Sequence, residues 1–180
     1  MNTFAIQHEP CCDRQKNLLV DDTQEKQDML WMQRCLDHLP QGVENQHEVP
    51  ISAIIIDKNN NLIASAHNQP IKCNDPTAHA EIQALRQACS VQNNYRLDQC
   101  SIYITLEPCP MCFFALIQAR IKRIIFAAKD NKIGILSQKK YKYFHQACNH
   151  HFHWTGGICQ EAAEKKLIHF FQSKRTERIK

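Results

Sequence analysis

Two apolar, β-branched segments separated by a short helical segment constrain the fold of this chain more than any other feature. Residues 101–106 (SIYITL) and 121–128 (IKRIIFAA) are typical of strands. Between them, residues 110–119 (PMCFFALIQA) begin with proline, which is favoured in the first turn of a helix. A strand, a crossover helix and a second strand place the two strands parallel in one sheet.

An antiparallel hairpin is predicted upstream of this pair. Residues 51–57 and 62–67 are apolar runs on either side of Lys58-Asn59-Asn60-Asn61, a typical turn sequence. Hairpin and parallel pair together indicate an α/β fold: a three-layer α/β/α sandwich around a mixed sheet of about five strands. Three further helices are predicted from the spacing of apolar residues: 24–39, 80–88 and 159–173.

The helical spacing also predicts which residues pack in the core and where one helix begins. In residues 24–39 the apolar side chains recur at intervals of three and four, and the pattern ends before Pro40. For the helix over 80–88 we predict Thr77, which follows Asp75-Pro76, as the N-cap. The predicted core stripe of the first helix is Met29, Met32, Cys35, Leu36 and Leu39.

Length and composition are those of one globular domain. The chain has 180 residues, of which 43% are hydrophobic and 22% charged, which excludes a wholly disordered, collagen-like or coiled-coil protein. Residues 1–23 carry no sustained period and are predicted to be a flexible N-terminal tail before a single domain over 24–180. There is no apolar run long enough for a membrane span or a signal peptide. We therefore expect a cytoplasmic protein with no membrane partner, whose ten cysteines are reduced.

The charge of the chain is distributed unevenly. Residues 1–119 contain 8 Lys/Arg and 14 Asp/Glu, a net charge of −6, whereas residues 120–180 contain 14 and 4, a net charge of +10. A strongly basic segment favours a polyanionic partner such as nucleic acid, because cations gain affinity by displacing counterions from phosphates. A solvated lysine-rich surface explains the same charge equally well.

Two short motifs form the candidate site: His79-Ala80-Glu81 and Pro108-Cys109-Pro110-Met111-Cys112. Cysteines three positions apart in the first turn of a helix share one face, and the helix N-terminus favours the thiolate that zinc requires. With His79 as a third protein ligand, one tetrahedral position stays open for water, which is typical of catalytic zinc. Glu81 is then placed to take a proton from that water.

Each of these residues also has a structural explanation. A single Cys-x-x-Cys fits a redox pair or half of a zinc ribbon, His79 fits a core histidine, and Glu81 fits a first-turn helix charge. The sequence has no second Cys-x-x-Cys pair, which argues against the ribbon. A purely structural zinc site needs ligands but no proton shuttle, so the combination favours a catalytic site.

His-x-Glu followed by Pro-Cys-x-x-Cys is the signature of the zinc-dependent nucleobase deaminases. Further segments extend the likeness: Asn68-Gln69-Pro70, 75–82 (DPTAHAEI), 94–97 (NYRL) and 105–109 (TLEPC). With these, residues 24–180 resemble the bacterial tRNA-specific adenosine deaminases. The resemblance implies a cytidine deaminase-like fold, a homodimer, and hydrolytic deamination of adenosine to inosine at the wobble position of a tRNA anticodon, usually that of arginine tRNA.

The resemblance also implies the roles of four residues in the chemistry. His79, Cys109 and Cys112 hold one Zn²⁺ per subunit. Glu81 moves protons between the zinc-activated water and the flipped adenine, whose C6 is attacked before ammonia leaves.

A second group of residues is implied in binding the RNA. Asn68 matches the residue that hydrogen-bonds the target nucleoside, although an asparagine before Gln-Pro is also typical of a turn. Asp130 and Asn149 fall where the family contacts the anticodon loop. The candidate contacts to the RNA backbone are Lys132, Lys174, Arg175 and Arg178, with Arg120, Lys122, Arg123 and Lys129 as weaker ones.

Three departures from the family pattern concern packing and substrate rather than zinc. Phe113 and Phe114 stand where the family has small residues, and Ser52 replaces a glycine of the first strand. The loop over 134–140 lacks the family's Gly-Ser step.

Two other functions remain open on the sequence alone. One is a deaminase of a free nucleobase or nucleoside, of the cytosine or guanine type, on the same fold. The other is a non-catalytic, zinc-stabilised RNA-binding module. The basic C-terminal third favours an RNA substrate over a small molecule, and the presence of Glu81 favours catalysis over binding alone.

Overall fold

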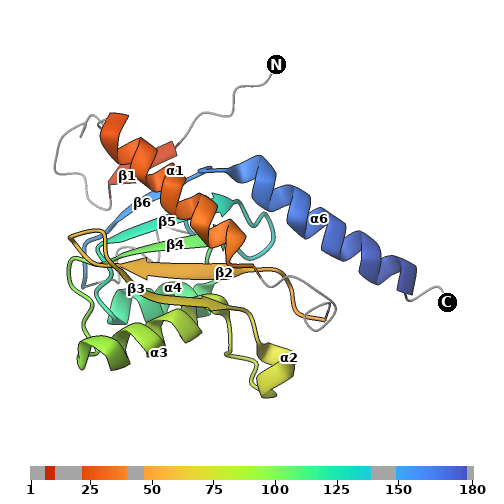
Figure 1. Ribbon diagram of the computed structural model, residues 1–180, viewed down its shortest axis with the longest axis horizontal. Helices are drawn as coiled ribbons and strands as arrows, with labels where there is room; N and C mark the ends of the chain where they lie inside the picture. The colour runs from red at the N-terminus through yellow and green to blue at the C-terminus, as the bar shows by residue number, and fades with distance from the viewer. Residues whose placement is uncertain (1–6, 11–21, 40–46, 139–148, 178–180) are drawn as a thin grey trace.

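A six-stranded sheet lies between two layers of helices in the computed structural model (Figure 1), which describes residues 7–10, 22–39, 47–138 and 149–177. The strand order is β1-β6-β5-β4-β2-β3. Strands β4, β5 and β6 are mutually parallel, while β2 is antiparallel to β3 and β4, and β1 is antiparallel to β6. The strands are β1 (Gln7–Pro10), β2 (Ser52–Ile56), β3 (Leu62–His67), β4 (Ser101–Leu106), β5 (Arg123–Ala128) and β6 (His153–Gly156).

The helices cover both faces of this sheet. Figure 1 shows α1 (Asp22–Asp37) and α6 (Gln160–Glu177) on one face, and α3 (Ala80–Gln92) and α4 (Pro110–Gln118) on the other. A single turn, α2 (Pro70–Cys73), follows β3. The predicted hairpin, parallel pair and three-layer sandwich are confirmed.

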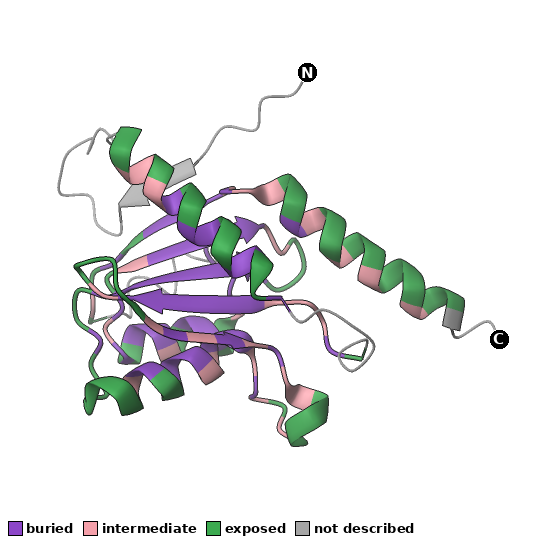
Figure 2. Cartoon of the chain, viewed as in Figure 1, coloured by how far each residue is buried: buried purple, intermediate pink, exposed green. Residues whose placement is uncertain are grey.

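Alternation along the strands divides the core into two apolar clusters, one on each face of the sheet. Ile102 and Ile104 of β4 pack with residues of α3 and α4, whereas Tyr103 packs with α1. Figure 2 shows the result: the central strands are buried except at one end residue of β4 and of β5, and the helices are buried only where they face the sheet. The sheet is therefore a rigid base for the loops at its edges.

The prediction of a tail over residues 1–23 is wrong at two places. Gln7–Pro10 forms strand β1, which pairs with β6 at the edge of the sheet, and α1 begins at Asp22 rather than at residue 24. The sequence QHEP contains no apolar residue, so no alternation marked it as a strand. Its pairing is through the backbone, and Pro10 is tolerated because β1 is an edge strand. Residues 1–6 and 11–21 lie outside the described part of the chain.

The predicted core stripe of the first helix is correct except at its beginning. Met32, Cys35, Leu36 and Leu39 are buried, but Met29 is 51% exposed. Asp28 lies in the buried position instead, because it forms an ion pair with Arg123 of β5. An apolar-only pattern cannot predict a buried carboxylate whose partner is far along the chain.

The polar loops gather at the end of the sheet where the parallel strands finish. We call this end the site edge, as distinct from the edge strands β1 and β3. Strands β3, β4, β5 and β6 all end there, β2 begins there, and the N-termini of α3 and α4 follow β3 and β4. Loops after the carboxyl ends of parallel strands are the usual location of binding sites in such folds. Among the residues that the structure describes, no helix combines the length and the apolar character needed to cross a membrane.

Candidate active site

A cluster of three possible metal ligands lies between the beginnings of α3 and α4. His79 is the N-cap residue of α3, Cys109 is the N-cap residue of α4, and Cys112 is in the first turn of α4. His79 Nδ1 lies 3.7 Å from Cys109 Sγ and 3.4 Å from Cys112 Sγ, and all three ligand atoms fall within 4.8 Å of one another. Zinc bonded to sulfur and nitrogen in a tetrahedron places its ligand atoms about 3.6 Å apart. The cluster therefore fits zinc, and three protein ligands leave the fourth tetrahedral position to a non-protein ligand.

The three side chains of the cluster shift one another's pKa values. The pKa of Cys109 is lowered, mainly by its hydrogen bond with Cys112 and also by one with His79, and the same thiol pair raises the pKa of Cys112. The pKa of His79 is raised, mainly by its hydrogen bond with Cys109. A divalent cation would favour the thiolate and neutral imidazole forms that serve as ligands.

Glu81 lies in the first turn of α3, two residues after His79, and is only 4% exposed. Burial raises its pKa to about 7. A carboxyl group whose pKa is near neutral can both accept and return a proton at physiological pH. The structure thus brings together all four residues that the two sequence motifs predicted for the chemistry: His79, Glu81, Cys109 and Cys112.

Asn68 joins this group through the backbone of α3. Its side chain is 5% exposed, and its Oδ1 accepts a hydrogen bond of 2.8 Å from the backbone N–H of Ala80. The N–H groups at the start of a helix lack partners within the helix, so Asn68 supplies one of the missing acceptors. It ties the end of β3 to the residues on either side of Ala80, namely His79 and Glu81.

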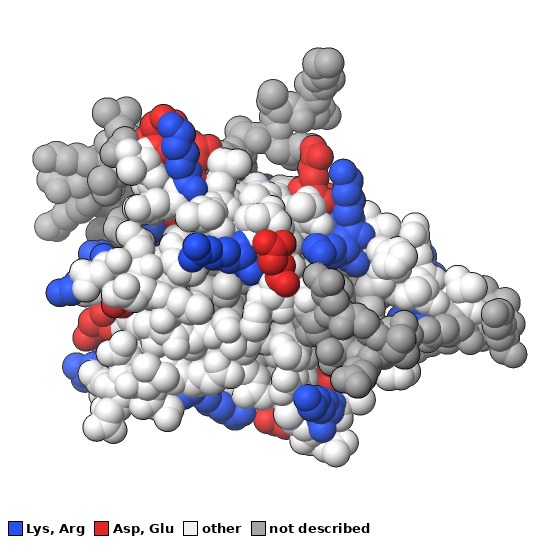
Figure 3. Space-filling model, viewed as in Figure 1, with Lys and Arg blue, Asp and Glu red and all other residues white. Residues whose placement is uncertain are grey.

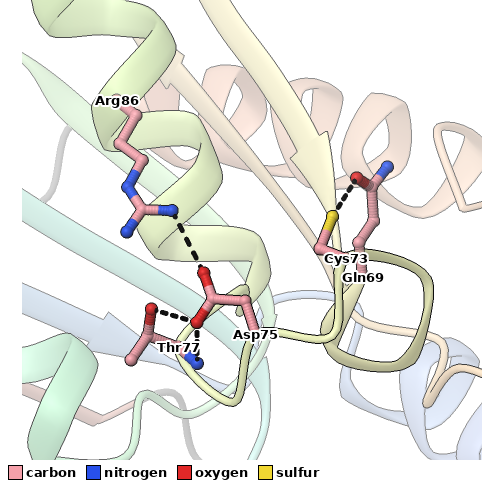
Figure 4. Close-up of polar contacts among 5 residues, drawn as sticks. All are labelled: Gln69, Cys73, Asp75, Thr77 and Arg86. Atoms are coloured by element: carbon pink, nitrogen blue, oxygen red, sulfur yellow. Dashed lines mark hydrogen bonds and ion pairs between the residues drawn. The ribbon is translucent and has the colours of Figure 1, made fainter.

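The prediction that Thr77 caps α3 is wrong. Its N–H and Oγ1 both donate to Asp75 Oδ1, at 2.8 and 2.7 Å, and Arg86 from α3 reaches the other carboxylate oxygen at 3.5 Å (Figure 4). Asp75 thereby fixes the turn that leads into His79. An Asp two residues before a Thr is typical of such a turn, and this was the signal that the capping prediction overlooked.

Asp130 follows β5 at the site edge, and its backbone N–H donates to Glu107, the residue after β4, at 3.1 Å. Oδ1 of Asp130 accepts hydrogen bonds from the N–H groups of Lys132 and Ile133, at 2.8 and 3.1 Å. The carboxylate therefore shapes its own loop, and Lys132 is exposed on that loop.

The structure does not bring Asn149 to the site. Asn149 precedes β6, and its carbonyl oxygen accepts a hydrogen bond of 2.8 Å from Arg120, which follows α4. Both therefore lie at the edge opposite the site edge, as does Lys122, which precedes β5. The contact of Asn149 with the anticodon loop therefore stays a prediction from the family resemblance, and its position in this chain is away from His79 and Glu81.

The remaining cationic candidates have different surroundings. Arg123 is occupied by its ion pair with the buried Asp28, at 2.7 Å, so the prediction that it contacts phosphate is wrong. On α6, Lys174 lies 3.5 Å from His47, and Arg175 donates to the backbone of its own helix. Arg178 lies outside the described residues. On the face shown in Figure 3, lysine and arginine side chains lie in several separate places with acidic side chains among them.

Two buried carboxylates at the site edge were missed by the sequence analysis. Glu48 accepts hydrogen bonds of 2.9 Å from the backbone N–H groups of Ile71 and Lys72, next to Asn68 in the chain. Glu107 accepts hydrogen bonds from the loop after β5. No local pattern marks a carboxylate that binds backbone N–H groups more than twenty residues away.

The two phenylalanines after Cys112 differ in their surroundings. Phe113 is fully buried, with its ring edge-on to Phe152 at 5.7 Å between centroids, whereas Phe114 is 38% exposed. The larger side chain at 113 is thus accommodated in the core, and that at 114 adds apolar surface to α4. Ser52, the other departure in the packing, donates to the backbone carbonyl of Cys35 and so ties β2 to α1.

Comparisons with known proteins give one family. Residues 25–128 match the model of the cytidine and deoxycytidylate deaminase zinc-binding region. The tRNA-specific adenosine deaminase of Haemophilus influenzae is 39% identical over 147 residues, which are 82% of this chain and 85% of that protein.

Solved structures agree with this result. A chain from a study of A-to-I editing by tRNA:A34 deaminases at the wobble position of transfer RNA is 31% identical, with a TM-score of 0.65. That match covers 81% of this chain and 99% of the other. Guanine deaminase from Bacillus subtilis is 39% identical with a TM-score of 0.52, over 56% of this chain and 63% of that one.

Proposed function

Because this chain belongs to the cytidine and deoxycytidylate deaminase family, we propose that it converts adenosine to inosine at the wobble position of a tRNA anticodon, that of arginine tRNA. The observation that carries the chemistry is the buried Glu81 beside the cluster of His79, Cys109 and Cys112. The likeness to tRNA-specific adenosine deaminases over most of both chains supports the substrate. With such a substrate, the enzyme acts in the cytoplasm.

The proposed reaction adds water to adenosine and releases ammonia. One zinc ion per subunit, held by His79, Cys109 and Cys112, supplies the lowered pKa of water that makes a nucleophile available near neutral pH. Glu81 accepts a proton from the water that adds to C6 and delivers it to N1 of the adenine. Glu81 then takes the remaining proton from the hydroxyl now at C6 and gives it to the amino group, so that the C6–N6 bond breaks, the C6 carbonyl of inosine forms and ammonia leaves.

Asn68 is proposed to orient the nucleoside. Because its Oδ1 already accepts from Ala80 N–H, its amide nitrogen is the group that donates to the substrate. The same hydrogen bond fixes the side chain relative to Glu81, so the base and the proton carrier are positioned by one contact.

The experiment that tests this function is an assay of inosine formation. The purified protein is given an arginine tRNA anticodon stem-loop with adenosine at the wobble position, and free adenosine, cytosine and guanine in parallel. Turnover confined to the stem-loop is expected. Turnover of guanine or cytosine alone would overturn the RNA substrate and favour the small-molecule reaction to which the Bacillus subtilis relative points.

Removing one metal ligand is expected to remove the metal. In Cys112→Ser, zinc content measured by elemental analysis falls well below one ion per chain, because a hydroxyl is a far weaker zinc ligand than a thiolate. Cys89→Ser is the matched control, since Cys89 lies near the other end of α3 and should keep full zinc content. Equal zinc in the Cys112 variant and in the control would contradict the assigned ligand set.

We propose that the RNA backbone is bound by Lys132 and by Lys174 and Arg175 of α6. Replacing Lys174 and Arg175 by alanine should reduce the slope of log Kd against log salt by about 1.4, since each contact to single-stranded RNA contributes about 0.7. The control replaces Lys58 and Lys122, which lie at the opposite edge of the sheet. If the control lowers the slope as much as the α6 variant does, the docking surface lies elsewhere.

We further propose that the enzyme is a homodimer. Met111 and Phe114 are 37% and 38% exposed on α4, next to the metal-binding cysteines. Apolar side chains grouped on one helix supply surface for a subunit contact beside the site. Sedimentation velocity measures the state directly, and a monomer at micromolar concentration would contradict the proposal.

A further inference from the structure

Glu107 is the residue that follows β4 and stands two positions before Cys109. Its backbone N–H donates to Ala128 O of β5, at 2.8 Å, which continues the parallel pairing of the two strands past their ends. The side chain is only 3% exposed. A buried carboxylate requires hydrogen-bond donors around it, and here they all come from the loop after β5.

Both oxygens of this carboxylate accept hydrogen bonds. Oε2 accepts from the backbone N–H of Asp130, at 3.1 Å, and from the hydroxyl of Ser137, at 2.8 Å. Oε1 accepts from the backbone N–H of Ser137, at 2.7 Å. The two ends of the loop 130–137 are therefore held by a single side chain.

The middle of the same loop is packed against Glu107. A Cβ atom added to Gly134 would lie 2.5 Å from Oε2 of Glu107 and 2.5 Å from the backbone oxygen of Asp130. Gly134 also donates its N–H to that oxygen, at 3.0 Å. Ile135 and Leu136 are 2% exposed and fix the far side of the loop in the core. The loop is thus packed closely around the carboxylate.

We propose that Glu107 is a positioning residue for RNA binding: its carboxylate holds the loop 130–137 so that Asp130 and Lys132 stay at the site edge, where the metal-binding cysteines also lie. This inference rests on the proposed function, in which that loop contacts the anticodon. In this role Glu107 is neither a metal ligand nor a contact to the substrate. It acts through the loop, so its loss changes binding of the RNA more than the chemical step.

The variant Glu107→Gln tests this role with almost no change in shape. An amide has one oxygen, yet each carboxylate oxygen of Glu107 accepts from a different backbone N–H. Whichever way the amide is turned, its NH₂ faces one of these donors, so one end of the loop is released. We expect the KM for the stem-loop to rise about tenfold while kcat changes less than about threefold and zinc content stays at the wild-type value.

A matched control exists at the opposite edge of the sheet. Asp57 also organises a turn with its carboxylate, accepting from Asn59 N–H at 2.7 Å and from the backbone and side-chain N–H groups of Asn61 at 2.9 Å. Asp57→Asn makes the same carboxylate-to-amide change far from the RNA, where the amide oxygen can keep both backbone hydrogen bonds, and it should leave KM unchanged. Gly134→Ala disturbs the loop by steric contact instead of by lost hydrogen bonds, and it should raise KM as Glu107→Gln does.

Three results would overturn the proposal. The first is an unchanged KM in both Glu107→Gln and Gly134→Ala. The second is a loss of zinc that matches the loss of activity, which would make Glu107 a support for Cys109. The third is an equal rise of KM in Asp57→Asn, which would indicate a general loss of stability.

The role of Glu107 can be separated from the proposed substrate. If the wild-type protein fails to turn over the stem-loop, the proposed function fails first. Hydrogen exchange then measures how often the loop opens, without any substrate. Faster exchange of the amides of residues 130–137 in Glu107→Gln, but not in Asp57→Asn, supports the positioning role. Unchanged exchange in that loop rejects it.

Discussion

Glu81→Gln is expected to lower kcat on the anticodon stem-loop by about 10⁴-fold, at the upper end of what general acid–base catalysis contributes. Glutamine has the shape of glutamate but can neither accept the proton of the attacking water nor return it. Both proton transfers of the proposed reaction depend on this one group, which is why the expected loss is large. Single-turnover kinetics with saturating enzyme measures the chemical step without the contribution of binding.

Zinc content and stem-loop affinity of this variant should match the wild type, because Glu81 is neither a ligand nor an RNA contact in the proposed mechanism. Glu48→Gln is the matched control. Glu48 is also a buried carboxylate at the site edge, but its two hydrogen bonds go to a single oxygen, which glutamine can replace. The control should keep nearly full activity. Turnover by Glu81→Gln at a rate close to that of Glu48→Gln would remove Glu81 from the mechanism.

Asp28→Ala is expected to lower the free energy of unfolding by about 3–5 kcal/mol, as removal of one member of a buried ion pair typically does. Asp28 is 1% exposed and accepts hydrogen bonds from the hydroxyl of Tyr103, at 2.7 Å, and from both terminal nitrogens of Arg123. Burial, together with the charge of Asp28, raises the pKa of Tyr103, so its hydroxyl stays protonated and remains a donor. Without Asp28, the guanidinium of Arg123 and the hydroxyl of Tyr103 lose the carboxylate to which they donate in the core between α1 and the sheet.

Urea unfolding followed by circular dichroism measures this change, and Asp22→Ala on the same helix is its control. Asp22 pairs with Lys26 at 2.6 Å, but the two side chains are 81% and 73% exposed. Such surface pairs contribute about 0.2–1 kcal/mol. An equal decrease in the free energy of unfolding in both variants would contradict this prediction. It would mean that the buried ion pair of Asp28 contributes no more to stability than the exposed pair of Asp22.

The sequence predicted the elements whose formation depends on local pattern. Ser101–Leu106 has the bounds predicted for it, because an uninterrupted apolar run between polar turns allows only a central strand. The metal cluster was also predictable, since His79 and the two cysteines belong to short motifs that bring their own helix N-termini with them. These features are set by residues close together in the chain.

Features that depend on distant partners were not predictable. Asp28 replaces Met29 in the core because of Arg123, which is 95 positions further along the chain. Asn68 rather than Thr77 accepts the hydrogen bond from the first N–H group of α3, because the end of β3 comes to lie against the start of that helix. The position of Asn149 at the opposite edge of the sheet was also not predictable, because it depends on the direction in which β6 runs.

Strand β1 has a consequence for how the protein is handled. It pairs with β6 from Gln7 to Pro10, so a chain truncated at residue 21 for expression would leave the outer edge of β6 with unpaired N–H and C=O groups. An open edge of this kind is a template for a strand from another molecule. We therefore expect a protein that starts after residue 21 to aggregate through β6 more readily than one that retains β1.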